Sequence, residues 1–267
     1  MKQRIISAIL MIAIFVPFLL IGELPFAIFM AVLGVFSLWE LIHVREGVKE
    51  FPSILKLFAY IMVLIFSLYR YNSIEFQMQF DYRVMSLILF LFLAPMVFIH
   101  NFKEYDLNDA LFLIGSVLFI GLSFNLIVVT RNFDIMYIIY LFLITTITDT
   151  FALITGMLVG RHSLCPNISP KKTVEGLIGG VFMGTFVASS FYYTVINSSI
   201  SLVFLILSTM GLCLVGQLGD LVFSSIKRSY GVKDFSNVIP GHGGMLDRFD
   251  SLIFVTFAFV ILLGVIL

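Results

Sequence analysis

Charged residues and cysteines are scarce in this sequence. Only 12% of its 267 residues are charged, whereas about a quarter of the residues in a typical soluble domain are charged. The two cysteines, Cys165 and Cys213, lie in a loop and in an apolar run, a setting that indicates neither a disulfide framework nor a metal site. The formal net charge is zero, so the overall charge gives no argument for nucleic-acid binding. The sequence also has no internal repeat, soluble domain or low-complexity linker.

Apolar sequence dominates instead. The chain is 60% hydrophobic and contains thirty phenylalanines, and its apolar runs of about twenty residues are long enough to cross a hydrocarbon core of about 30 Å. The first run follows a basic start like a signal peptide, but no small-residue cleavage site follows it, so we expect a retained helix. The prediction is an all-α, polytopic membrane protein with about nine transmembrane helices, at 5–22, 25–43, 52–69, 84–100, 109–129, 135–159, 176–196, 201–226 and 250–267.

The cations are distributed unequally between the two sides of this expected topology. One side has thirteen: Lys2, Arg4, Arg45, Lys49, Lys56, Lys103, Arg161, Lys171, Lys172, Lys227, Arg228, Lys233 and Arg248. The other side has three: Arg70, Arg83 and Arg131. Because cytoplasmic loops carry the excess of lysine and arginine, we expect a cytoplasmic N-terminus and two long cytoplasmic loops in the C-terminal half.

Glycine divides the chain in a second way. Fourteen of the nineteen glycines follow residue 150, and small residues allow membrane helices to pack closely or a ligand to approach the backbone. We expect residues 1–134 to form a transmembrane scaffold of about five helices. Residues 135–267 are expected to form the catalytic region, with about four helices and two cytoplasmic loops.

Four aspartates mark candidate functional positions. Asp149 and Asp220 lie inside expected membrane spans, where an acid costs roughly 2.5–3.5 kcal/mol on insertion scales and normally has a partner or a water-filled site. Each is therefore a functional candidate or the partner of a neighbouring helix. Asp247 and Asp250 lie three residues apart and share a helix face. Acids also favour the first turn of a helix for structural reasons alone.

Two basic loops accompany these acids. The segment "KRSYGVKDFSNVIPGHGGMLDRFD" contains a glycine-rich turn whose backbone N–H groups can face a phosphate. The loop "GRHSLCPNISPKKTVEG" adds Lys171 and Lys172, with hydroxyls at Ser169 and Thr173. Its lysines alone are equally consistent with setting the membrane orientation, and no G-x-x-x-x-G-K-[ST] phosphate loop is present. Carboxylates suit Mg²⁺, Mg²⁺ suits polyphosphate, and lysine and arginine suit phosphate oxygens.

Two sequence motifs lie in the C-terminal half. The pattern S-x-x-K-R-x-x-x-x-K-D, a short spacer and H-G-G-x-x-D-R-x-D is matched at Ser224, Lys227, Arg228, Lys233, Asp234, His242, Gly243, Gly244, Asp247, Arg248 and Asp250. The upstream "DTFALITGMLVGRHSLCPNISPKKTVEG" is similar to a second block, D-x-x-A-x-x-x-G followed by S-P-K-K-T-x-E-G. Together these motifs resemble those of the phosphatidate cytidylyltransferase (CDP-diacylglycerol synthase) family. Leu153 replaces the usual aromatic residue and Val174 the usual tryptophan, and neither has a proposed charge role.

The resemblance implies a reaction of CTP with phosphatidic acid that gives CDP-diacylglycerol and pyrophosphate. It also implies a multi-pass protein of the cell (plasma) membrane, a homodimer with a cytoplasmic-face site, and a requirement for Mg²⁺, with a second cation as an alternative. The family's metal ligands correspond to Asp220 and Asp250, and we expect Asp247 to join them. Asp149 either joins this cluster or organises a lysine.

The remaining motif residues are expected to bind substrate. For neutralising triphosphate and pyrophosphate we expect Lys227, Arg228, Lys233 and Arg248. Further substrate contacts are expected from Ser169, Lys171, Lys172, Thr173, Ser224, His242, Gly243 and Gly244, with the two lysines on either the nucleotide or the lipid phosphate. His242 has three open roles: phosphate donor, loop anchor or proton carrier.

Two other functions remain open from the sequence. A cation-coupled transporter would explain Asp149 and Asp220, but it leaves the clustered lysines unexplained and usually brings an internal repeat. A related CTP-dependent enzyme acting on another lipid acceptor fits the same motifs. A non-catalytic lipid-binding paralogue is disfavoured, because every charged motif position is filled.

Overall fold

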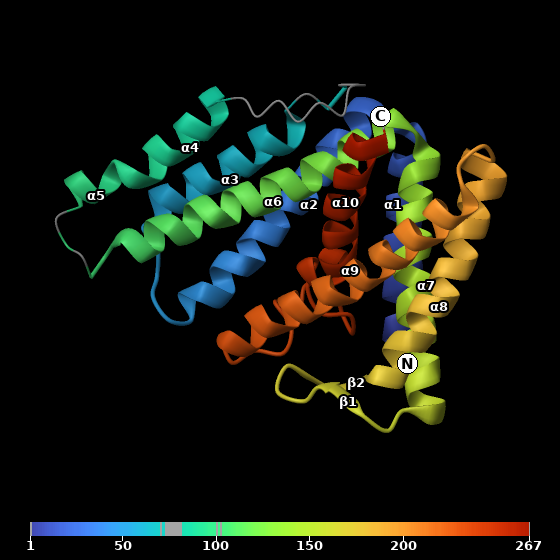
Figure 1. Ribbon diagram of the computed structural model, residues 1–267. Coiled ribbons are helices and arrows are strands. Elements are labelled where there is room, and N and C mark those ends of the chain that lie inside the picture. The colour runs from blue at the N-terminus through green and yellow to red at the C-terminus, as the bar shows by residue number, and fades with distance from the viewer. Residues whose placement is uncertain (1, 70, 73–81, 100, 102, 267) are drawn as a thin grey trace. The chain divides into compact units, whose positions relative to one another are not determined.

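The computed structural model describes the chain except for residues 1, 70, 73–81, 100, 102 and 267 (Figure 1). Arg70, one of the three cations expected on the sparse side, lies outside the described residues. The first helices are α1 (Lys2–Ile21), α2 (Glu23–Glu46), α3 (Ser53–Leu68), α4 (Tyr82–Leu93), α5 (Pro95–Phe98) and α6 (Leu107–Phe133). They are followed by α7 (Ile135–Val159), α8 (Val174–Phe191) with a π-helical end at Tyr192–Ile196, α9 (Leu202–Ser229) and α10 (Leu246–Ile266).

A helix overlaps each of the nine expected ranges, and the all-α membrane class is confirmed. Five helical segments are long and apolar enough to cross a bilayer: Glu23–Glu46, Leu107–Phe133, Ile135–Val159, Val174–Ile196 and Leu202–Ser229. The crossing of the membrane by all nine, and the cytoplasmic N-terminus, stay predictions.

The structure adds two local features to the expected helices. A helical break separates α4 from α5 at Pro95, which is the first residue of α5 and lacks the backbone N–H that a continuous helix needs. A two-stranded antiparallel hairpin, β1 (Ser163–Cys165) and β2 (Ser169–Thr173), lies in the loop between α7 and α8. The sequence predicted a loop between these helices but did not predict the hairpin within it.

The described chain groups into two compact units. Unit 1 contains residues 1–132 and 234–246, and unit 2 contains residues 133–233 and 247–267. The segment Asp234–Leu246, which carries the "GHGG" turn, thus groups with the N-terminal helices.

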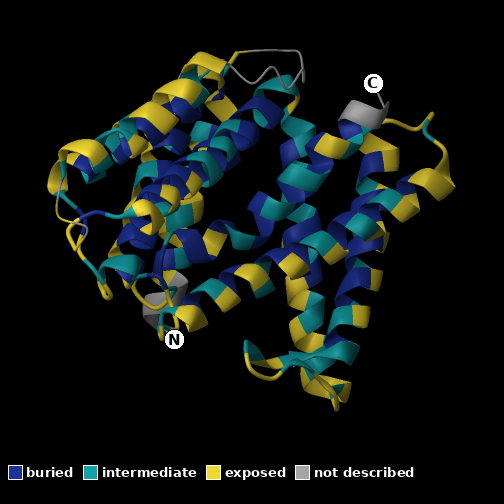
Figure 2. Cartoon of the chain, turned by 60° about the vertical axis from the view of Figure 1, so that its left-hand side comes forward, coloured by how far each residue is buried: buried dark blue, intermediate teal, exposed yellow. Residues whose placement is uncertain are grey.

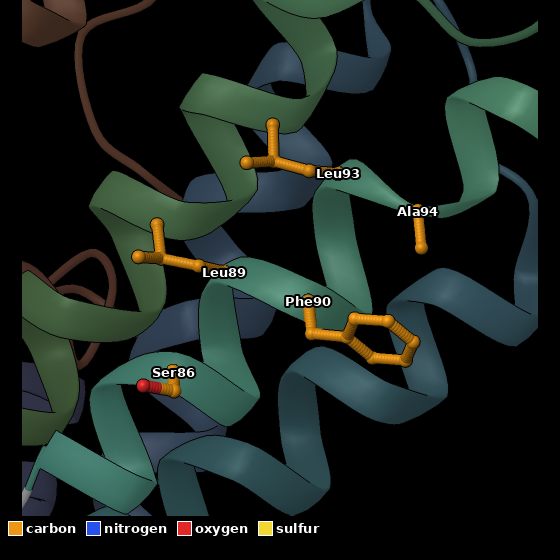
Figure 3. Close-up of a pocket in the computed structure, with 5 residues that line it drawn as sticks. All are labelled: Ser86, Leu89, Phe90, Leu93 and Ala94. Carbon is orange, nitrogen blue, oxygen red and sulfur yellow. The ribbon is translucent and has the colours of Figure 1, made fainter.

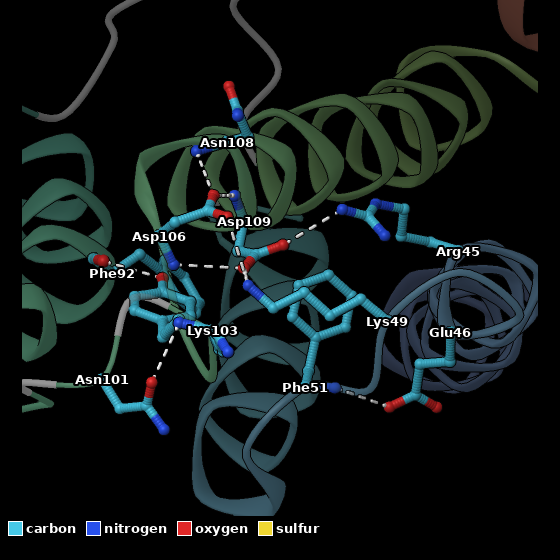
Figure 4. A network of polar contacts seen from close by, with 11 residues as sticks. Arg45, Glu46, Lys49, Phe51, Phe92, Asn101, Lys103, Asp106, Asn108 and Asp109 are labelled. Carbon is cyan, nitrogen blue, oxygen red and sulfur yellow. Dashed lines mark hydrogen bonds and ion pairs between the residues drawn. The ribbon is translucent and has the colours of Figure 1, made fainter.

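Unit 1 is organised by the antiparallel pair α2 and α6, which is joined by polar contacts at both ends. At one end, the Arg45 guanidinium lies 3.1 Å from the buried Asp109 carboxylate, and Lys49 contacts both Asp106 and Asp109 (Figure 4). At the other end, the backbone N–H of Glu23 donates to the Asn132 side-chain oxygen at 3.0 Å. The two sets of contacts fix the register of the pair.

Arg131 makes further polar contacts in unit 1, near the hydrogen bond between Glu23 and Asn132. Its guanidinium donates to the carbonyl oxygens of Leu19 and Leu20, both at 2.8 Å, and so satisfies acceptors at the C-terminus of α1. Gly22 follows with a positive φ of 72°, and a side chain there would overlap Arg131. Arg131, one of the three cations expected on the side with few cations, therefore has a structural role at the end of α1.

In unit 2, α7 and α8 pack through small residues. A Cβ atom at Gly180 would lie 2.5 Å from the carbonyl oxygen of Thr148, and one at Gly184 would lie 2.1 Å from the Thr148 hydroxyl. Several glycines of the C-terminal half therefore serve close helix packing, as small residues commonly do in membranes.

Large apolar side chains are exposed along most helices (Figure 2). On α4, for example, Leu89, Phe90 and Leu93 line a shallow apolar hollow with Ser86 and Ala94 (Figure 3). Such surfaces are unfavourable in water and suit contact with lipid.

Candidate active site

The polar centre of unit 2 is a chain of side chains from α7, α9 and β2. The Gln217 amide nitrogen donates to the Asp149 carboxylate at 2.6 Å. The Gln217 amide oxygen accepts from the Lys172 ammonium at 3.1 Å. Lys172 also lies 2.6 Å from the Asp220 carboxylate. Two acids that lie in long apolar helices are thus connected through one lysine and one amide, which satisfies the need of each for a partner.

The position of Lys172 follows from strand geometry. Lys171 and Lys172 are consecutive in β2, so their side chains point to opposite faces. Lys171 is exposed, whereas Lys172 is partly buried and reaches Asp220. The two lysines, which the sequence treats alike, therefore have different environments.

A second ion pair joins α9 to α10. The Lys227 ammonium lies 2.5 Å from the Asp247 carboxylate, and the side chains are only 9% and 4% exposed. Asp247 belongs to the first turn of α10, which begins at Leu246 instead of residue 250 as predicted. Removing one member of such a pair would leave an uncompensated buried charge.

One face of α9 carries most of these groups. Gln217, Asp220, Ser224 and Lys227 are spaced by three or four residues, which places them along one side of the helix. The Ser224 hydroxyl lies 3.3 Å from Asp220. This polar stripe on a largely apolar helix contains three of the functional candidates, Asp220, Ser224 and Lys227, together with Gln217.

Asp250 adds a third acid to the cluster. Its carboxylate interacts electrostatically with Asp220 and Asp149, and with the cation Lys227. Asp149 in turn interacts electrostatically with Lys172, Asp220 and Arg248. Unit 2 therefore brings three acids from three helices near three cations, an arrangement suited to a ligand that combines phosphate groups with a metal.

The acids fit a metal site that is shared with substrate. In the described part of the chain, no three histidine, cysteine, aspartate or glutamate side chains are arranged to hold one metal ion by themselves. Mg²⁺ in phosphate-transfer sites is, however, usually held by one or two carboxylates, with water and substrate phosphates completing its shell. Asp220 and Asp250 are two carboxylates that interact electrostatically, and their role as metal ligands stays a prediction. The carboxylate of Asp247 contacts Lys227, and its role as a ligand stays a prediction.

Several other candidates have structural contacts. The Arg228 guanidinium donates to the carbonyl oxygens of Ile168 and Val232, which connects the end of α9 to the hairpin loop and to the following turn. The Thr173 hydroxyl accepts from the Gly176 backbone N–H and caps α8. The exposed candidate residues are Asp149, Lys171, Arg228, Lys233 and Arg248, and Ser169 begins β2.

The "GHGG" turn makes contacts within unit 1. The His242 Nδ1 atom lies 2.8 Å from the Ser7 hydroxyl of α1, a contact that corresponds to the loop-anchor alternative. Gly243 has a φ of 82°, a conformation that favours glycine. Its carbonyl oxygen accepts from the backbone N–H of Ile239 at 3.0 Å.

Sequence reasoning missed three polar residues. Gln217 connects Asp149 to Lys172, Ser7 contacts His242, and Glu40 binds the segment after "GHGG". The criterion that selected Asp149, an acid inside an expected span, applies equally to Glu40 and would have found it. Gln217 and Ser7 carry no comparable signal, since neutral polar side chains are common in membrane helices.

Known proteins resemble this chain over nearly its full length. The model of the cytidylyltransferase family matches residues 2–266. A Staphylococcus aureus protein named phosphatidate cytidylyltransferase is 38% identical over 255 residues, which cover 96% of each chain. Proteins of the same name from Staphylococcus haemolyticus and Bacillus subtilis are 36% and 35% identical, over 96% of this chain and 96% and 94% of their own lengths.

Proposed function

Because the chain belongs to the cytidylyltransferase family, we propose that it is the membrane enzyme that converts CTP and phosphatidic acid into CDP-diacylglycerol and pyrophosphate. The observation that carries this assignment beyond the family is the connected network of Asp149, Gln217, Lys172 and Asp220 in unit 2. It joins acids suited to a metal with a lysine suited to phosphate, and two of its helices, α7 and α9, are largely apolar.

The reaction needs charge neutralisation more than a strong base. A phosphate monoester has a second pKa near 6, so an oxygen of the lipid phosphate is already a nucleophilic anion at neutral pH. This oxygen attacks the α-phosphorus of CTP and forms a new P–O bond. The bond from the α-phosphorus to the oxygen that bridges to the β-phosphate breaks, and pyrophosphate leaves. Catalysis of phosphate transfer is mostly positioning and electrostatic stabilisation.

Lysine side chains supply much of that stabilisation in this proposal. A lysine ammonium has three N–H donors. Within the described residues, Lys172 contacts Gln217 and Asp220, which leaves one donor for a phosphate oxygen. Lys227, held by Asp247 at 2.5 Å, presents a fixed positive charge near Asp250. The exposed cations Arg228, Lys233 and Arg248 neutralise the triphosphate and the departing pyrophosphate, while Lys171 contacts either phosphate group.

Asp220 and Asp250 are the proposed ligands of Mg²⁺. When bound there, Mg²⁺ would supply charge neutralisation on the phosphate oxygens. Asp149 orients Lys172 through Gln217 instead of binding the metal directly, a role supported by the 2.6 Å hydrogen bond from the Gln217 amide.

The proposal includes a location and an assembly. The excess of thirteen cations over three supports a multi-pass protein with the active site on the cytoplasmic face of the cell membrane. The resemblance of the motifs supports a homodimer. Electrophoresis under native conditions or light scattering in detergent tests the dimer separately from the activity.

The function is tested by measuring pyrophosphate release from purified protein in detergent with Mg²⁺. We expect release with CTP and phosphatidic acid, and none when ATP, GTP or UTP replaces CTP. Release only with another phosphorylated lipid would mean that this lipid is the acceptor in place of phosphatidic acid, while the CTP-dependent transfer would stand. No release with any lipid from folded protein would contradict the proposal.

A further inference from the structure

Glu40 is an acid buried in α2 that the reaction described above does not use. It is 0% exposed, although it lies in one of the apolar helices that are long enough to cross a membrane. A buried carboxylate is costly unless hydrogen bonds compensate it. Its position therefore calls for specific partners, and the structure shows three.

All three partners of Glu40 belong to the segment Asp234–Leu246. The Ser236 hydroxyl donates to Oε1 at 2.6 Å and the Met245 backbone N–H donates to the same oxygen at 2.7 Å. The Leu246 backbone N–H donates to Oε2 at 2.8 Å. One carboxylate thus binds both ends of a segment that lies about two hundred residues further along the chain.

The contacts at Leu246 have a further physical basis. Leu246 is the first residue of α10, so its N–H group belongs to the positive end of a helix. A negatively charged side chain is stabilised at such an end. Asp247, whose carboxylate contacts Lys227, is the next residue in the sequence. Glu40 therefore fixes the backbone immediately before a proposed active-site residue.

The Glu40 carboxylate also accounts for the glycine at residue 244. A Cβ atom at this position would lie 2.6 Å from Oε1 and 2.7 Å from Oε2 of Glu40. The φ of Gly244 is not positive, so alanine is compatible with its backbone. The requirement for glycine at residue 244 thus comes from the Glu40 carboxylate, whereas Gly243 is required by its φ of 82°.

We propose that Glu40 is a positioning residue of the enzyme, which holds the turn His242–Leu246 and the start of α10 so that the adjacent motif residues are placed for the triphosphate. The contact of His242 with Ser7 provides a second attachment of the same turn within unit 1. The inference rests on the proposed function, because the groups that Glu40 places are those assigned to CTP.

A double-mutant cycle between Glu40 and Gly244 tests this inference. Gly244→Ala and Glu40→Ala are each expected to lower kcat/KM for CTP, on the order of 100-fold, because small displacements of reacting groups have effects of that size. In the Glu40→Ala background, Gly244→Ala is expected to cause little further loss, since the carboxylate that clashes with the new Cβ is gone. KM for phosphatidic acid should stay close to that of the wild type in all three variants.

Gly243→Ala is the matched control for the cycle. Its strain comes from its own φ, so its loss should be the same with and without Glu40. If Gly244→Ala is equally damaging in the Glu40→Ala background, glycine at residue 244 serves the substrate or the backbone, and the proposal is overturned.

Hydrogen exchange gives a readout that does not depend on activity. Glu40→Gln keeps the size of the side chain but places an amide N–H₂ group against at least one of the donors, so it serves if Glu40→Ala does not fold. The exchange rate in residues 236–246 should rise at least tenfold in this variant. An unchanged rate would overturn the proposal that Glu40 holds this segment. A wild-type protein that is inactive with CTP and phosphatidic acid, but shows this rise, would refute the proposed function alone.

Discussion

The Lys227 ammonium and the Asp247 carboxylate lie 2.5 Å apart and are almost completely buried. They come from different helices, α9 and α10, and twenty residues separate them in the sequence. The pair therefore fixes the start of α10 against the end of α9 and keeps a positive charge at the candidate active site. A buried pair of this kind is costly to break from one side.

Lys227→Met should destabilise the protein by about 3–5 kcal/mol, the typical cost of leaving one buried charge without its partner. The double variant with Asp247→Asn removes both charges and should recover most of that loss, while both variants stay inactive. Thermal unfolding in detergent measures the difference. Equal destabilisation in the single and double variants would show that the two charges are not coupled.

Gln217→Leu should reduce activity by roughly 10- to 100-fold, the effect typical of losing a residue that orients a metal or phosphate site. The substitution removes both the donor to Asp149 and the acceptor for Lys172. Leu218→Ala, at a neighbouring residue that is 56% exposed, is the matched control and should keep nearly full activity. Steady-state kinetics with CTP and phosphatidic acid compares them, and a fully active Gln217→Leu variant would remove the network from the mechanism.

The polar cluster at the end of α2 and α6 should make stability depend on pH (Figure 4). A hydrogen bond from the Asp109 backbone N–H is the largest cause that lowers the pKa of Asp106 below 3.8, and Lys49 adds to it. Because the folded-state pKa lies below the unfolded value, the carboxylate contributes stability above pH 3.8 that is lost as the pH falls through the folded-state pKa.

Asp106→Asn should remove this contribution, so its melting temperature should lie below that of the wild type at neutral pH and converge with it in acid. Lys49 has the opposite sign. Burial is the largest effect on its pKa and lowers it, but Asp109 and Asp106 outweigh burial and raise the pKa above 10.5. The contribution of Lys49 is present below pH 10.5 and is lost as the pH rises through the folded-state pKa.

For Asp106→Asn, a difference in melting temperature from the wild type that stays constant across the acid range would contradict this account.

The two cysteines allow the membrane orientation to be tested without new labels. Cys165 lies in the hairpin and is partly exposed, whereas Cys213 is buried in α9. A membrane-impermeant maleimide should modify Cys165 in inside-out vesicles and not in intact cells, with Cys165→Ser as the control. Labelling in intact cells would place the hairpin on the outer side and reverse the predicted topology.

The sequence was sufficient to predict the membrane class and the helical ranges, because long apolar runs permit little else in a bilayer. It could not predict the break at Pro95 or the start of α10 at Leu246. Element ends depend on local caps and tertiary contacts, such as the binding of the Leu246 N–H by Glu40.

The motifs similarly predicted which residues matter but not how they pair. Lys171 and Lys172 look equivalent in sequence, and only the pleat of β2 directs Lys172 to Asp220. Gln217 is ordinary in a helix until its neighbours Asp149 and Lys172 are known. The sequence also does not distinguish the roles of individual glycines: Gly180 allows close helix packing, whereas Gly244 makes room for Glu40.

The most direct test of the central claim compares three aspartate variants in the formation of CDP-diacylglycerol and pyrophosphate from CTP, phosphatidic acid and Mg²⁺. Asp220→Asn and Asp250→Asn should each lose at least about 100-fold in kcat, as expected when charge stabilisation of phosphate transfer is removed. Asp134→Asn changes an acid of the same unit that caps α7. Asparagine caps equally well, so this variant should stay active. Equal activity of all three variants, or loss in Asp134→Asn alone, would contradict the assignment of the active site to Asp220 and Asp250.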